Sequence, residues 1–187
     1  ENIINTQTQF SCYHGYPPLG GRPACHGHPS PLSIVPALAT SCNSFFCYGF
    51  NAMLSNREHY SSQSQAFDIW GNYLSNMGYG HKLGIDLPSE KTGFIPNNKF
   101  YNKLWKDNWN AHRVISIAIG QGEILATPLQ IANFAAIVAN RGYYYAPHVV
   151  RQRKGIALDS LYSRRHESGI DKSVFDIIAD GMANAVT

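Results

Sequence analysis

The first half of the chain alternates apolar segments with short polar breaks, in a pattern that predicts helices. One helix is expected to begin near Ser33, whose hydroxyl can cap it, with Pro36 in its first turn. A second is expected over residues 44–55, which are apolar on nearly every side, so this helix should be buried. A third is expected over residues 64–77, where apolar side chains recur at spacings of three and four.

The second half mixes strand-like and helix-like patterns. Residues 113–119 alternate Ile with other residue types, which predicts a short buried strand or an extended segment. Residues 143–152 predict an edge strand, because a proline interrupts them. Thr127 begins the clearest helix, with Pro at its first position and Gln130 completing a capping box. With a last helix over residues 172–187, the pattern indicates an α+β fold that is rich in helix.

The 187 residues are expected to form one partial domain in three parts. Residues 1–31 are an irregular loop rich in Gly, Pro, Cys and His, and residues 32–110 form a helical lobe. Residues 111–187 hold a strand, a buried helix and a C-terminal helix. The chain opens without Met and stops inside an apolar helical pattern, from which we expect it to be a piece of a longer protein.

Composition excludes several classes of function. Charged residues make up 14% of the chain, the formal net charge is +3, and Lys and Arg form no stripe, so a nucleic-acid partner is not expected. No stretch of ~18 apolar residues predicts a membrane span. The carboxylates form no paired constellation of the kind that glycosidases use.

The segment "ATSCNSFFC" places polar residues at the junction between two apolar helices. In an extended backbone, Ser41 and Asn43 would point the same way and Cys42 the other way. A hydroxyl can pass a proton, and an amide can both donate and accept a hydrogen bond, so the pair suits a proton relay. The alternative is structural, because Ser and Asn commonly end and begin helices.

The four cysteines and two nearby histidines are candidates for a metal site. Cys12, Cys25, Cys42 and His28 could close around Zn²⁺, with His26 as the alternate ligand. Such a site would tie the N-terminal loop to the junction at Ser41–Asn43. A Cys12–Cys25 disulfide and a set of unrelated free thiols are the two alternatives, and the spacing is not that of a C-x-x-C knuckle.

Three long phrases then give a family resemblance. They are "SPLSIVPALATSCNSFFCYGF", "MGYGHKLGIDLPSEKTGFIPN" and "ISIAIGQGEILATPLQIANFAAIVANRGYYYAPHVV". Together they resemble the transpeptidase domain of class B penicillin-binding proteins, of the elongation type called penicillin-binding protein 2, over roughly residues 25–187. The resemblance implies the helical lobe of a serine-transpeptidase fold, with only part of its antiparallel sheet present.

In that family three motifs build the site: S-x-x-K, S-x-N and K-[ST]-G. The resemblance puts Ser41 and Asn43 on the second motif, as a proton shuttle and as a contact for the motif lysine and the substrate amide. No S-x-x-K occurs in the chain, so the nucleophile is expected upstream. Lys91-Thr92-Gly93 has the residue types of the third motif but not its context. It lies in loop sequence and comes before "TPLQ", whereas the family's third motif lies on a core strand after that helix. The chain is therefore expected to be inactive alone. The parent protein is expected to be an enzyme, and whether this piece counts as one stays open.

The resemblance also implies a setting. The parent would cross-link peptidoglycan stem peptides through an acyl-serine, bind β-lactams, and need no cofactor for its chemistry. The zinc expected from the cysteines and histidines would be structural. It would be membrane-anchored at the periplasmic face of the inner membrane, with cell-wall elongation proteins as partners. Two other interpretations stay open: a non-catalytic, zinc-stapled binding module of the cell-wall machinery, and, less well supported, a β-lactam sensor domain.

Overall fold

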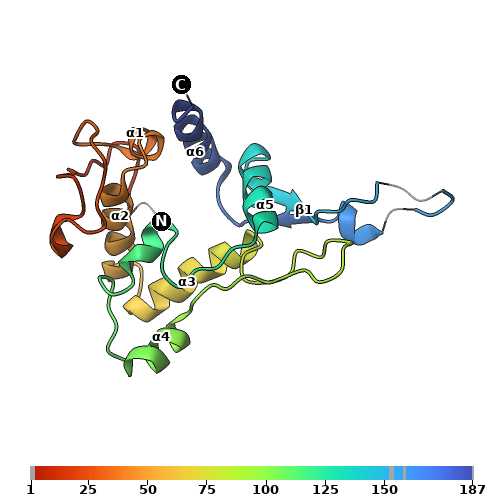
Figure 1. Ribbon diagram of the computed structural model, residues 1–187, viewed down its shortest axis with the longest axis horizontal. Coiled ribbons are helices and arrows are strands. Elements are labelled where there is room, and N and C mark those ends of the chain that lie inside the picture. Colours follow the sequence, from red (N-terminus) through yellow and green to blue (C-terminus); the bar gives the residue numbers. More distant parts are fainter. Residues whose placement is uncertain (1–2, 152–153, 158, 187) are drawn as a thin grey trace. The chain divides into compact units, whose positions relative to one another are not determined.

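The computed structural model describes residues 3–151, 154–157 and 159–186 of the chain (Figure 1). The elements in chain order are η1 (Pro17–Leu19), α1 (Ile34–Ala39), α2 (Asn43–Ser55), α3 (Gln63–Asn76), α4 (Asn98–Trp105), η2 (Ile115–Ile119), α5 (Pro128–Ala139), β1 (Tyr143–Tyr145), η3 (Ser160–Ser163), β2 (Arg165–Glu167) and α6 (Lys172–Asn184). Here η denotes a 3₁₀ helix. The chain is thus rich in helix, with a small antiparallel sheet, as its sequence predicts.

The residues divide into two compact units. Unit 1 comprises Glu1–Ile69, Pro96–Glu123 and Ile177–Thr187, and unit 2 comprises Trp70–Ile95 and Ile124–Asp176. The predicted division into residues 1–31, 32–110 and 111–187 stays a prediction. Among the described residues, no helix is both long enough and apolar enough to cross a membrane.

Unit 1 is built around α2, which is buried as expected. Phe45, Cys47, Phe50 and Leu54 are all buried, and η2 packs against the same helix. A second apolar cluster joins Phe67 of α3 to two aromatic rings, with centroid distances of 5.5 Å to Tyr101 and 5.3 Å to Trp109. Two aromatic clusters therefore give unit 1 its core.

Unit 2 is held by a buried glutamine. Thr127 and Gln130 form the predicted capping box of α5. The Gln130 Nε2 group also lies 3.1, 3.0 and 2.9 Å from the carbonyl oxygens of Gly78, His81 and Thr92, so its two N–H groups are shared among three acceptors. We call this arrangement the Gln130 latch. It fastens the irregular segment after α3 to the start of α5.

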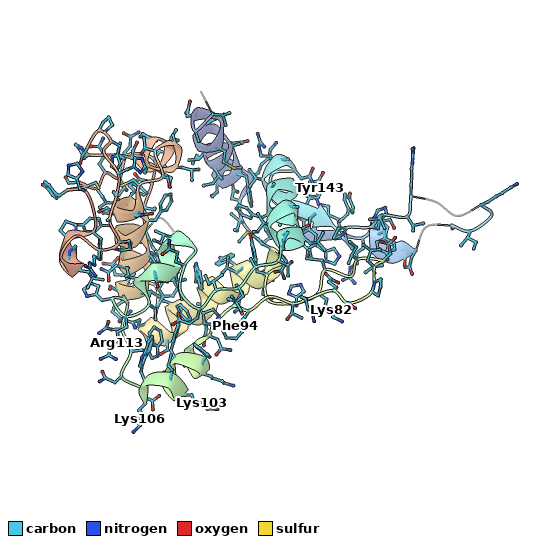
Figure 2. The ribbon with its side chains drawn as sticks, in the orientation of Figure 1. Lys82, Phe94, Lys103, Lys106, Arg113 and Tyr143 are labelled. Carbon is cyan, nitrogen blue, oxygen red and sulfur yellow. The ribbon has the colours of Figure 1, made fainter. Side chains whose placement is uncertain are left out.

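Gly93 shows why that segment needs glycine. Its φ is +62°, and a Cβ there would lie 2.3 Å from the Leu125 carbonyl oxygen. Phe94 (labelled in Figure 2) and Leu125 then exchange two backbone hydrogen bonds of 2.7 and 2.9 Å. The long "KTGFIP" and "TPLQ" phrases thus have a structural role, because they form one joint.

The prediction of a strand or extended segment over 113–119 is wrong. The segment forms η2. In it, the Ile117 N–H donates to the Val114 carbonyl and the Gly120 N–H donates to the Ile117 carbonyl, both at 3.0 Å. Gly120, at φ +71°, ends it. The isoleucines alternate because Ile115 and Ile117 are buried. The backbone N–H and C=O groups form hydrogen bonds within the 3₁₀ helix, so no neighbouring strand is needed.

Two other predicted elements end earlier in the structure, and one observed α-helix and one strand were not predicted. The strand expected over 143–152 ends at Tyr145, just before the Ala146-Pro147 pair, and Gln152 lies outside the described residues. The last helix ends at Asn184, and Thr187 likewise lies outside. The sequence analysis missed α4 and β2. Asn97 begins α4 by accepting from Phe100 N–H at 2.9 Å, a capping signal that lies before a short and largely polar helix.

The small sheet belongs to unit 2. Strand β1 pairs with β2 in antiparallel register, with Tyr144 opposite His166. Helix α5 packs against β1 (Figure 1). Gly142 precedes β1 at φ +116°, where a Cβ would lie 3.0 Å from the Phe175 ring.

Candidate functional site

The junction between α1 and α2 is a tight turn. Thr40 ends α1 and donates its hydroxyl to the Pro36 carbonyl at 2.8 Å. Ser41 then adopts φ +51°, in the left-handed region, and the following Cys42 is extended. The expected extended conformation at Ser41 is therefore wrong, because the turn needs a left-handed residue there. That Ser41 and Asn43 share a face stays a prediction.

The two motif residues differ in their surroundings. Ser41 is exposed to solvent. Asn43 is the first residue of α2 and is half-buried, and its Nδ2 donates to the Ala24 carbonyl at 2.7 Å. This bond joins the junction to a loop 19 residues away and fixes the amide plane. Within the described residues, the Asn43 Oδ1 accepts no hydrogen bond.

The N-terminal loop is folded by isolated pairings. Phe10 pairs with Leu32 and Gly15 pairs with Ala24 across the loop. Cys12 N–H donates to Ser30 Oγ at 2.8 Å, and Cys25 N–H donates to the His14 carbonyl at 2.9 Å. These contacts bring the loop cysteines to the start of α2.

The structure gathers the four predicted metal-ligating residues into one group. The ligand atoms of Cys12, Cys25, His28 and Cys42 all lie within 4.8 Å of one another. His26 is outside that group, and its ring lies 5.6 Å from the His28 ring. All four cysteines of the chain are free thiols, so no disulfide is formed. We call the four residues the thiol–imidazole cluster.

The imidazole of His28 has the arrangement of a metal ligand. Its Nδ1 lies 2.8 Å from the Pro29 carbonyl oxygen, a contact that places the ring proton on Nδ1. Its Nε2 is buried and has no hydrogen-bond partner among the described residues. A neutral imidazole with Nδ1–H held by a carbonyl presents a free lone pair on Nε2, which is the usual form of a metal-binding histidine.

The sulfur atoms have few competing contacts. Cys42 Sγ caps α2 by accepting from Phe45 N–H at 3.4 Å, and Cys25 Sγ accepts from Ser44 N–H at 3.3 Å. Burial raises the pKa of Cys42 to about 12 and raises the pKa of Cys25 as well. The thiols of Cys25 and Cys42 are thus neutral in the metal-free chain, and a divalent cation would deprotonate them. Thiolate and imidazole donors in a group of four are the set that Zn²⁺ prefers.

Lys91-Thr92-Gly93 lies in a loop. The Thr92 carbonyl accepts a hydrogen bond from Gln130 Nε2. The Gly93 backbone has a positive φ and lies so close to the Leu125 carbonyl that no side chain fits there. This is a structural joint of unit 2, and the residues lie outside any strand.

Sequence reasoning missed the Asn43–Ala24 bond and the Gln130 latch. Both join residues far apart in sequence, at separations of 19 and of 38 or more. The one local signal was Gln130 itself, a polar residue inside an otherwise apolar helix. Its role as a cap was predicted, and its three long-range acceptors were not.

The whole chain is similar to one known protein family. The profile described as penicillin binding protein transpeptidase domain matches residues 1–187. The chain belongs to the penicillin-binding protein transpeptidase domain family. Its length corresponds to about a fifth of the curated relatives that it matches.

Several relatives can be named. The peptidoglycan D,D-transpeptidase MrdA of Acinetobacter baumannii is 36% identical over 66% of this chain and 17% of its own length. MrdA of Escherichia coli is 26% identical over 81% of the chain and 22% of its length. In Bacillus subtilis, penicillin-binding protein 2A is 32% identical over 65% of the chain and 16% of its length.

Solved structures have the same fold. Pseudomonas aeruginosa PBP2, in complex with WCK 5153, covers 96% of this chain at a TM-score of 0.73 and 20% identity, over 39% of its own chain. Helicobacter pylori PBP2, solved in complex with MreC, covers 97% at a TM-score of 0.68 and 21% identity, over 31% of its own chain. At these identities the likeness establishes the fold.

Proposed function

We propose that the chain forms part of a peptidoglycan D,D-transpeptidase and supplies the second motif of its acyl-transfer site. The observation that carries this proposal is the position of Ser41-Cys42-Asn43, on a turn at the start of a buried helix, inside a chain that matches the transpeptidase family over its whole length. Ser41 is exposed, so its hydroxyl is accessible to a reactant. Asn43 is held by Ala24 with one amide acceptor to spare.

In the proposed reaction, a serine outside these 187 residues attacks the carbonyl of a D-Ala-D-Ala stem. The C–N bond to the terminal D-Ala breaks, its amine takes up a proton, and an acyl-serine forms. The amine of a neighbouring stem then attacks the acyl-serine, forms the cross-link and returns the serine hydroxyl. Ser41 passes the proton to the leaving amine, and Asn43 Oδ1 accepts from the motif lysine or the substrate amide.

We also propose that the thiol–imidazole cluster holds one structural Zn²⁺ through Cys12, Cys25, His28 and Cys42. The metal would supply charge to hold three thiolates together and would take no part in the acyl transfer. Cys25 follows Ala24, whose carbonyl orients Asn43, so the metal would fix the motif through the loop. His28, with its buried and unpartnered Nε2, is the residue that favours zinc over a disulfide.

For the parent protein we propose β-lactams as inhibitors, cell-wall elongation proteins as partners, and a membrane-anchored position at the periplasmic face of the inner membrane. The support is indirect. One structural relative was solved with MreC, and another in a peptidoglycan synthase complex. In line with the composition, no nucleic-acid partner is proposed.

Covalent labelling with a fluorescent penicillin tests the catalytic proposal. A longer protein that includes an upstream S-x-x-K should be acylated, and the 187-residue chain should not. In the longer protein, Ser41→Ala should slow acylation about a hundredfold, because a positioned proton carrier is lost. Ser55→Ala, at an exposed serine of α2, is the matched control and should label normally. Acylation of the short chain, or normal labelling of Ser41→Ala, would contradict the proposal.

The second candidate is a non-catalytic, zinc-stapled module of the cell-wall machinery. The observation in its favour is that no S-x-x-K occurs in the sequence. The flanking gene sequence decides between the two. An S-x-x-K upstream and a K-[ST]-G soon after Thr187 support the enzyme, and the lack of both supports the module.

A further inference from the structure

Unit 2 contains a polar pocket beside its two-stranded sheet. The pocket has a volume of about 340 Å³ and is lined by the end of α3, the turn after that helix, β1 and β2. Its polar lining includes Asn76, His81, Arg164, Arg165, His166 and Glu167. We call it the hairpin pocket. Figure 2 labels Tyr143, the first residue of β1 and the neighbour of the lining residue Tyr144.

His166 has an unsatisfied ring nitrogen at this pocket. Its Nε2 is buried and has no hydrogen-bond partner within the described ranges. The ring cannot easily turn away, because it stacks on Tyr144 with a centroid distance of 4.9 Å and an interplanar angle of 14°. A buried polar nitrogen without a partner is costly, so a rigid ring that keeps one points to a ligand or an ordered water.

The two arginines that line the pocket differ in their partners. Arg165 pairs with Glu167, and its guanidinium lies 3.7 Å from the centroid of the Tyr143 ring. Arg164 also lines the pocket, yet it makes no ion pair or hydrogen bond with any other residue that the structure describes. The Arg164 guanidinium, which is planar and permanently charged, is therefore left to bind a ligand. Guanidinium groups form paired hydrogen bonds with carboxylate and phosphate groups.

The other polar groups of the lining are a histidine and an amide. His81 Nδ1 lies 3.2 Å from the Tyr79 carbonyl oxygen, a contact that orients the ring and makes Nε2 of the neutral ring an acceptor. Asn76 contributes a side-chain amide at the end of α3. A volume of about 340 Å³ exceeds that of a bare inorganic ion, so the pocket has room for a small organic molecule.

We propose that the hairpin pocket is a binding site for a small-molecule oxyanion, a carboxylate or phosphate group, with the Arg164 guanidinium as its charged group and His166 as the titratable ring in its wall. The site uses neither the Ser41–Asn43 motif nor the thiol–imidazole cluster. It is therefore independent of the proposed transpeptidase function.

Binding at this site is linked to a proton. Burial, followed by electrostatic repulsion from Arg164 and then from His81, lowers the pKa of His166, so the free ring is neutral at neutral pH. The groups that face it are Arg164 at the end of η3, Arg165 and Glu167 from β2, His81 from the turn, and Tyr144 from β1. A bound anion favours the imidazolium and raises the His166 pKa. Affinity should therefore rise as the pH falls from ~8 to ~6.

Calorimetric titration of the full-length protein tests the site, with tricarballylate and inorganic phosphate as separate probes. We expect millimolar affinity or better for at least one probe, and a loss of about tenfold in Arg164→Gln. Arg151→Gln, at an exposed arginine of the same unit outside the pocket, is the control and should bind as the wild type does. Tighter tricarballylate identifies a carboxylate ligand, and tighter phosphate identifies a phosphate ligand.

A second variant separates the roles. His166→Gln keeps a polar side chain and should remove most of the pH dependence. Absence of binding by both probes would overturn the proposal, and so would equal affinity in Arg164→Gln and wild type. A pH profile unchanged in His166→Gln would remove His166 from the site.

Discussion

The two units each fix an irregular loop against the N-terminus of a helix, and they do so with different chemistry. In unit 2 the Gln130 latch satisfies its acceptors with donors from the chain itself. In unit 1 the thiol–imidazole cluster leaves His28 Nε2 buried and unpartnered among the described residues, with three thiols close together. The latch is complete as it stands, and in our proposal a cation would complete the cluster. Metal dependence is therefore expected of unit 1.

Metal removal should give the largest effect. Elemental analysis of the purified protein should find about one Zn²⁺ per chain. Structural zinc sites contribute on the order of 10 kcal/mol in small domains, so a strong chelator should lower the midpoint of thermal unfolding by ~10 °C or more. Circular dichroism during heating provides the measurement.

Cysteine variants sharpen that prediction. Cys25→Ser should abolish zinc retention, because it removes one of the four ligands. Cys47→Ala is the matched control: Cys47 is buried on α2 but stands outside the cluster, so this variant should lose packing and keep its zinc. A metal-free protein with two fewer titratable thiols would indicate a Cys12–Cys25 disulfide instead.

Loss of the latch in unit 2 should have the next largest effect. Gln130→Ala removes the donor to three carbonyls and the acceptor for Thr127 N–H, which should lower the free energy of unfolding by ~3 kcal/mol. Thr127→Ala removes only the cap and should cost ~1 kcal/mol. Urea denaturation measures both values. Equal costs for the two variants would show that the three long-range bonds contribute nothing.

The fold was predictable where the signal was local. The capping box at Thr127, the buried helix around Phe45 and the family phrases could all be recognised from neighbouring residues. The strand or extended segment expected over 113–119 was wrong, because alternating isoleucines indicate burial and a 3₁₀ helix can bury the same isoleucines. Helix α4 was missed, since its polar surface hid the cap at Asn97.

The site was predictable in part for the same reason. The residue types of the thiol–imidazole cluster pointed to a metal, and the structure distinguishes His28 from His26. The left-handed turn at Ser41 and the Asn43–Ala24 bond depend on tertiary contacts that no spacing rule contains.

The Asn43–Ala24 bond gives a smaller effect that separates structure from chemistry. Asn43→Ala should lower the free energy of unfolding by ~1 kcal/mol and weaken zinc retention, because the loop before Cys25 loses its anchor. Ser41→Ala, at an exposed position, should change stability by less than ~0.5 kcal/mol. Both variants should slow acylation in the longer protein. Equal stability losses would place Ser41 in the structural network as well.

The smallest effect concerns an exposed joint of unit 2 that resembles the latch in design. Asp86 accepts from Val149 N–H at 2.9 Å and Val150 N–H at 2.8 Å, and these bonds lower the pKa of its carboxyl. A lowered pKa in the folded state means that the joint is fully formed above the unfolded pKa of ~3.9 and is lost as the pH falls through the folded value.

Hydrogen exchange at Val149 and Val150, corrected for intrinsic rates, should thus show protection at neutral pH that decreases below ~pH 4. Asp86→Asn should remove the pH dependence, since an amide holds no titrating charge, and Asp180→Asn should preserve it. Protection that stays constant down to ~pH 2 in the wild type would show that other contacts hold the segment. In that case the contrast between the units would rest on the Gln130 latch alone.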